Sequence, residues 1–134
     1  MISPDIDTLR LFLHVLAAAV WVGGQIVVGA VVPRLRGIHP DNARALAKGF
    51  ARVAWPAFGL AVVTGIWSLL DVPISDMSSD YQATLAIHVL LVAVAGTSAV
   101  VHSWGRTKLA LAIGGALGLL ASLGALFVGV LMVG

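Results

Sequence analysis

Two histidines within long apolar segments are the residues of this sequence best suited to do chemistry. His14 lies in the apolar run from Leu11 to Val32, and His88 lies in another apolar run that begins near Tyr81. Removing an imidazole from water costs free energy unless it has a partner, so a histidine inside a bilayer indicates a ligand, a proton path or a metal. Both residues are therefore candidate ligands.

The two histidines are predicted to lie at the same depth in the membrane. His14 follows Asp7 by seven residues, and His88 follows Tyr81 by seven residues. If both segments cross in the same direction, each imidazole lies roughly 10 Å inside the outer surface at helical rise. Two imidazoles at one depth on different helices can be the axial ligands of a haem iron. Because the chain has no cysteine, the haem would be held non-covalently, as haem b.

Neighbours of His14 are candidate contacts for this haem. Ala18 follows His14 by about one turn and is small enough to admit a flat macrocycle. Trp21 lies on the same helix face and could pack against a porphyrin, although packing between helices also accounts for it. Arg10 precedes His14 by one turn and could hold a propionate through a charge-assisted hydrogen bond.

Other interpretations of the histidines stay open. His102 follows His88 by fourteen residues, which places both on one helix face about 21 Å apart. This spacing resembles the paired haem ligands of membrane dihaem cytochromes b, and it makes His102 a further metal candidate. Solvation at the membrane surface is the simpler interpretation of His102 and His39. For His14 and His88 the simpler interpretation is a hydrogen bond to a carbonyl, or to one of the side chains Gln25, Thr64, Thr84 and Thr97.

The composition indicates that the helices carrying these residues lie in a membrane. Of the 134 residues 60% are hydrophobic and 10% are charged, which is too little charge to cover a soluble globule. Four segments, residues 8–32, 53–70, 81–104 and 109–133, are long and apolar enough to span a bilayer. We therefore expect an all-α integral membrane protein of one domain, a four-helix up-down bundle in contact with lipid.

Basic residues mark one side of the membrane. Every lysine and arginine except Arg10 falls between the first and second or the third and fourth segments. The positive-inside rule then places both connecting loops in the cytoplasm and both termini outside. Because this rule accounts for the excess of basic residues, we expect no nucleic-acid partner. In residues 41–52 a base recurs at every fourth position, which indicates either a helix on the membrane surface or the polar start of the second span.

The fourth segment carries a ridge of small residues, Gly114, Gly118 and Ser122. Such a ridge lets helices approach closely in lipid, either within one chain or between two copies in a homodimer. No internal repeat is evident in the sequence. The uniformly apolar composition of this segment also suits an accessory subunit of a larger membrane complex.

Two stretches of the first half resemble a known family. The run from His14 to Gly24, and the run from Phe50 to Trp67, resemble the copper-resistance D (CopD) family of small bacterial integral membrane proteins and the related membrane protoporphyrinogen oxidases. The resemblance implies the bacterial inner membrane, with copper transport in one branch and haem b bound through a first-span histidine, matching His14, in the other. The oxidase branch has a lysine in the third span, whereas this chain has His88.

These observations predict a membrane b-type haem protein that transfers electrons, with His14 and His88 as the iron ligands. An enzymatic activity of the oxidase kind is disfavoured by the missing lysine. One alternative is copper binding or transport, in which Met77 of the outer acidic loop and both histidines form an entry path. The other alternative is a non-catalytic accessory subunit.

Overall fold

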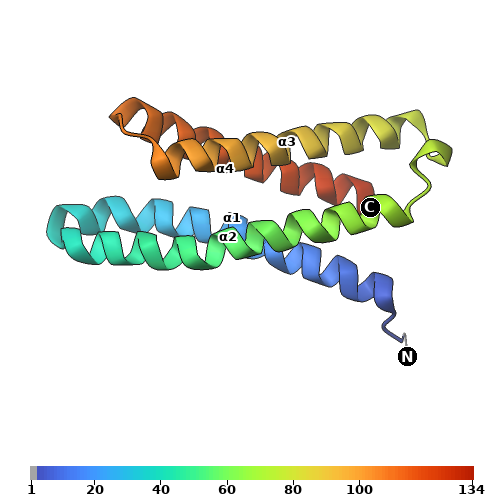
Figure 1. Ribbon diagram of the computed structural model, residues 1–134, viewed down its shortest axis with the longest axis horizontal. Helices are drawn as coiled ribbons and strands as arrows, with labels where there is room; N and C mark the ends of the chain where they lie inside the picture. Colours follow the sequence, from blue (N-terminus) through green and yellow to red (C-terminus); the bar gives the residue numbers. More distant parts are fainter. Residues whose placement is uncertain (1–2) are drawn as a thin grey trace. The chain divides into compact units, whose positions relative to one another are not determined.

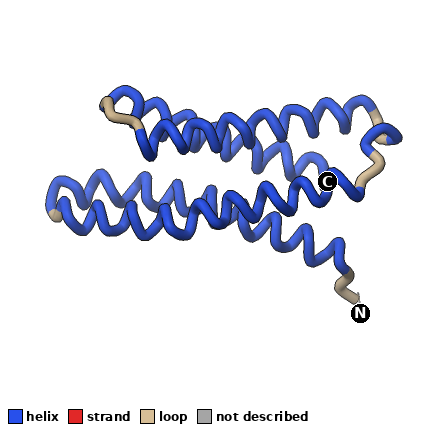
Figure 2. The backbone as a smooth tube through the Cα atoms, viewed as in Figure 1, coloured by secondary structure: helices blue, strands red, loops and turns tan. Residues whose placement is uncertain are grey.

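The computed structural model describes residues 3–134, and this part of the chain is all-helical. It has four long helices, labelled in Figure 1 and coloured blue in Figure 2: α1 (Ile6–Ile38), α2 (Pro40–Asp71), α3 (Ser79–Trp104) and α4 (Lys108–Val133). A short 3-10 turn, η1 (Ile74–Asp76), precedes α3. Each long helix contains an 18-residue stretch apolar enough to cross a bilayer, with mean hydropathy between 1.7 and 2.4 over that stretch. The predicted all-α, multi-pass membrane class is confirmed.

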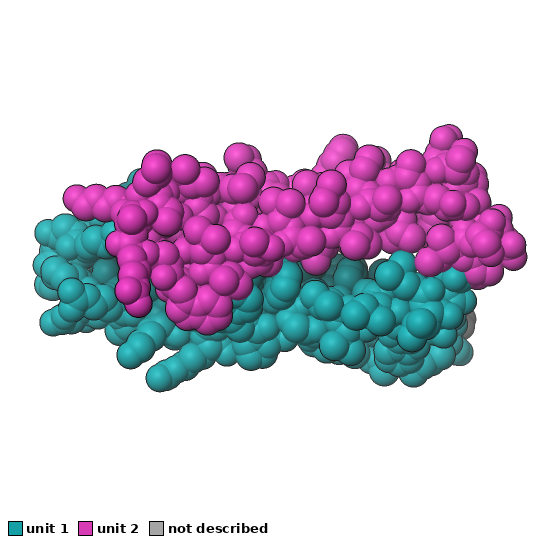
Figure 3. All heavy atoms as spheres, turned by 45° about the horizontal axis from the view of Figure 1, so that its top comes forward, with its two compact units in different colours: residues 1–72 teal, residues 73–134 magenta. Residues whose placement is uncertain are grey.

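The chain divides into two compact units, Met1–Val72 and Pro73–Gly134, which Figure 3 shows in separate colours. The first unit contains α1 and α2, and the second contains η1, α3 and α4. Within each unit the two long helices pack against each other as an antiparallel hairpin (Figure 1). Each hairpin positions its own histidines.

The first hairpin turns within a single residue. α1 ends at Ile38, α2 begins at Pro40, and only His39 lies between them. Proline suits the first position of a helix because its missing N–H would have no helical partner there. Residues 41–52 are therefore the beginning of α2, continuous with the second span, and not a separate surface helix.

The N-terminus of α1 is capped by Asp5. Its carboxylate accepts hydrogen bonds from the backbone N–H and the hydroxyl of Thr8, both at 2.7 Å. Both hydrogen bonds lower the pKa of the Asp5 carboxyl below its usual value, and the bond from the Thr8 hydroxyl has the larger effect. The cap therefore stabilises the helix end fully at pH values above the ordinary carboxyl pKa. This stabilisation is lost as the pH falls through the lowered pKa of Asp5.

Close helix approach holds the second hairpin together. Gly114, Gly118 and Ser122 are all buried. A Cβ added at Gly114 would lie 2.7 Å from the backbone nitrogen of His102 and 2.8 Å from the carbonyl oxygen of Ser98. The small-residue ridge therefore packs against α3 within the same chain, where dispersion contacts replace the hydrophobic drive that lipid cannot supply.

We expect Gly114→Leu to destabilise the second hairpin, because its side chain would overlap the backbone of α3. Overpacking of this kind costs on the order of 1–3 kcal/mol. Thermal unfolding in detergent measures the effect. Gly59→Leu is the matched control, since nothing lies within 4 Å of a Cβ added at Gly59. Equal stability of the two variants would show that the ridge does not set the helix approach.

Candidate functional site

The ring of His14 is held by the neighbouring helix α2. Its Nδ1 lies 2.8 Å from the carbonyl oxygen of Ala61 and 3.0 Å from the hydroxyl oxygen of Thr64. A carbonyl can only accept, and the Thr64 hydroxyl already donates to its own helix, to the Leu60 carbonyl at 2.7 Å. Both partners therefore require a proton on Nδ1, so in neutral His14 the lone pair lies on Nε2.

The second hairpin holds two histidines in the same way. Nδ1 of His88 lies 2.9 Å from the carbonyl oxygen of Ala125, and Nδ1 of His102 lies 2.6 Å from that of Leu111. Both carbonyls belong to α4, while both histidines belong to α3. Each neutral imidazole therefore again carries its proton on Nδ1 and its lone pair on Nε2.

A glycine accompanies each of these hydrogen bonds, four residues after the accepting carbonyl. The glycines are Gly65 beside His14, Gly129 beside His88 and Gly115 beside His102. An added Cβ would lie 3.4, 3.3 and 3.0 Å, respectively, from the nearest imidazole atom. Side chains in a helix lean toward its N-terminus, so the residue at i+4 covers the carbonyl of residue i. Glycine leaves that carbonyl open to the ring. We call each set of histidine, carbonyl and glycine a histidine clamp.

Two of the three clamps occupy equivalent places in the two hairpins. His14 and His88 both lie on the first helix of their hairpin and both begin the tripeptide His-Val-Leu. Their acceptors, Ala61 and Ala125, lie on the second helix, each four residues before the clamp glycine. The hairpins therefore share a repeated arrangement that is not evident from the sequence.

Arg10 has partners within its own hairpin. Its guanidinium forms ion pairs with Asp71 at the end of α2 and with Asp7 at 3.0 Å, and it lies 5.7 Å from the ring centroid of Trp67. Only 11% of its side chain is exposed. These two carboxylates account for a basic residue on the acidic side of the chain.

The structure also places the other residues predicted to contact a haem or copper, Trp21, Ala18 and Met77. Trp21 is buried against α2, with its ring centroid 4.6 Å from that of Phe58 and 5.6 Å from that of Trp55. It therefore packs between the helices of the first hairpin. Ala18 is half-buried on α1, and Met77 is half-buried just after η1. Within residues 3–134 no group of three or more His, Cys, Asp or Glu side chains gathers as a metal site.

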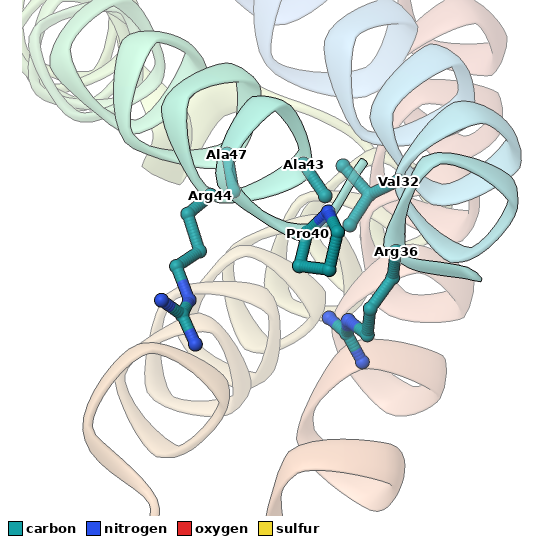
Figure 4. A pocket seen from close by; sticks show the side chains of 6 residues that line it. All are labelled: Val32, Arg36, Pro40, Ala43, Arg44 and Ala47. Carbon is teal, nitrogen blue, oxygen red and sulfur yellow. The ribbon is translucent and has the colours of Figure 1, made fainter. Parts of the chain in front are cut away.

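A separate hollow of about 180 Å³ lies near the turn of the first hairpin (Figure 4). It is lined by Val32, Arg36, Pro40, Ala43, Arg44 and Ala47. Figure 4 shows the side chains of Arg36 from α1 and Arg44 from α2 beside its apolar wall. No histidine lines this hollow.

Comparison with known proteins adds no relative: no protein family, no curated protein and no solved structure matches the chain.

We expect Arg10→Gln to lower thermal stability by about 1 kcal/mol, because it removes a partly buried cation from two carboxylates. Combining Arg10→Asp with Asp71→Arg should restore much of this loss. Arg44→Gln is the control, since its ion pair with Asp41 is largely exposed and should contribute little. Unchanged stability of Arg10→Gln, together with loss of bound haem, would instead assign Arg10 to a propionate.

Proposed function

We propose that the chain is a membrane-embedded b-type haem protein that transfers electrons, with His14 and His88 as axial ligands. The supporting observation is the tautomer that hydrogen bonding imposes on the two neutral imidazoles. Each donates its Nδ1 proton to a backbone carbonyl, so its ε nitrogen carries the lone pair. Histidines that bind metals commonly have this second-shell bond, which fixes the tautomer and orients the ring. The donor set therefore fits haem.

Haem suits these residues better than a copper ion held by protein alone. A porphyrin supplies four nitrogens to its iron, so the chain needs to add only one or two imidazoles. Copper(I) favours thiolate and thioether ligands, whereas the sequence has no cysteine and three methionines. The resemblance of the first span to membrane protoporphyrinogen oxidases also supports haem, because His14 matches their haem-binding histidine.

Electron transfer is the reaction class that two histidine ligands favour. When bound, haem would supply a one-electron couple, and its retention by the two imidazoles of His14 and His88 would favour electron transfer over oxygen chemistry. The chain would hold the ligands in one tautomer and surround them with apolar side chains that exclude water. We place the protein in the bacterial inner membrane with both termini outside, on the strength of its charge distribution and its resemblance to the CopD family.

Visible spectroscopy tests this proposal. The purified chain, expressed with sufficient haem, should show a Soret band and, after reduction, the sharp α-band of low-spin haem b. His14→Ala and His88→Ala should each lose the low-spin spectrum, because each removes an axial ligand.

His39→Ala is the matched control. His39 is exposed between α1 and α2 and makes no capping hydrogen bond through its side chain, so its loss should leave the spectrum unchanged. Absence of a Soret band from the folded wild-type chain would refute the proposal. Stoichiometric copper in that protein would favour the copper alternative.

A further inference from the structure

One difference between the two hairpins lies directly beside the clamps of His14 and His88. When Ala61 is placed on Ala125 and Gly65 on Gly129, Thr64 corresponds to Val128. Threonine and valine have nearly the same shape, so the two hairpins differ there by a hydroxyl in place of a methyl group.

We propose that the Thr64 hydroxyl makes the His14 imidazole more electron-rich than the Ala61 carbonyl alone would, and so makes it a stronger ligand of the proposed haem. The consequence for a haem depends on the function proposed above. The effect on the imidazole itself does not, because it arises from hydrogen bonds within the first hairpin.

The geometry around Thr64 gives its hydroxyl a single role toward His14. Thr64 is 2% exposed, and its hydroxyl lies within bonding distance of two carbonyls of its own helix, Leu60 at 2.7 Å and Ala61 at 3.1 Å. Its one proton is directed to these oxygens, so toward the His14 ring it presents a lone pair. Nδ1–H of His14 is thereby shared between the Ala61 carbonyl at 2.8 Å and the Thr64 oxygen at 3.0 Å.

A second acceptor on Nδ1–H changes the opposite side of the ring. Acceptors draw the proton away from Nδ1 and increase the electron density of the imidazole, which makes Nε2 a stronger donor to a metal. In an environment of low dielectric constant this polarisation is larger than in water. A stronger axial donor stabilises ferric over ferrous iron, so Thr64 should lower the reduction potential of a haem bound through His14.

The second hairpin provides the reciprocal test. Val128 has no hydroxyl, and the Ala125 carbonyl accepts from His88 at 2.9 Å. A threonine at this position could donate to the carbonyl of Gly124 one turn earlier, as Thr64 does to Leu60, and offer its lone pair to His88. Val128→Thr should therefore give the Nδ1 proton of His88 a second acceptor, as Thr64 does for that of His14.

Nitrogen-15 NMR of the histidine side chains in the haem-free chain tests the proposal directly. Thr64→Val should move the Nδ1 proton of His14 upfield and shift its Nε2 signal, with His88 unchanged. Val128→Thr should move the His88 proton downfield, with His14 unchanged. Thr97→Val is the control, since the Thr97 hydroxyl is exposed and bonds only its own helix, at Ala93. His14 signals that do not respond to Thr64→Val would overturn the proposal.

Redox titration of the haem-loaded chain extends the test to the proposed function. Thr64→Val should raise the reduction potential, Val128→Thr should lower it, and Thr97→Val should leave it unchanged. A purely structural role of Thr64 would change thermal stability without these opposite shifts. If no haem binds, the NMR result still decides the proposal about Thr64, while the proposed haem function fails.

Discussion

The hydrogen bond from Nδ1 of an imidazole to a carbonyl of the adjacent helix is the interaction on which the candidate site depends. A histidine within an apolar span needs a partner, and lipid offers none. The clamps solve this problem with backbone oxygens, at distances of 2.6 to 2.9 Å for the carbonyls. The same bond fixes the tautomer of the neutral ring, so the lone pair lies on the ε nitrogen.

Glycine makes this bond geometrically available. A carbonyl on a helix surface already accepts from its own helix, and a side chain four residues later normally covers it. At Gly65 and Gly129 no side chain intervenes, and the imidazole lies against the helix backbone. At Gly114 the absence of a side chain likewise lets the backbone of α4 pack directly against the backbone of α3. In a membrane protein such contacts replace the hydrophobic drive as the source of helix association.

The apolar runs of the sequence are enough to predict the helical class and the limits of the last two helices. Residues 81–104 and 109–133 were expected to span the membrane, and α3 and α4 cover Ser79–Trp104 and Lys108–Val133. Long uninterrupted apolar runs permit little else, because a backbone in lipid must satisfy its own hydrogen bonds. The start of α2 was not determined in this way, since a basic stripe suits both a surface helix and the polar start of a span. The structure shows the latter.

The sequence by itself determined that the chain crosses the membrane and that His14 and His88 are the unusual residues within it. Their partners were decided only by tertiary structure. The acceptors are backbone carbonyls, which every residue has and no residue type marks, and Arg10 meets Asp71 across 61 positions of sequence. Thr64 could be named as one candidate among several, but its contact with His14 depends on how α1 packs against α2. Helix periodicity determines which residues share a face, whereas packing between helices determines what that face contacts.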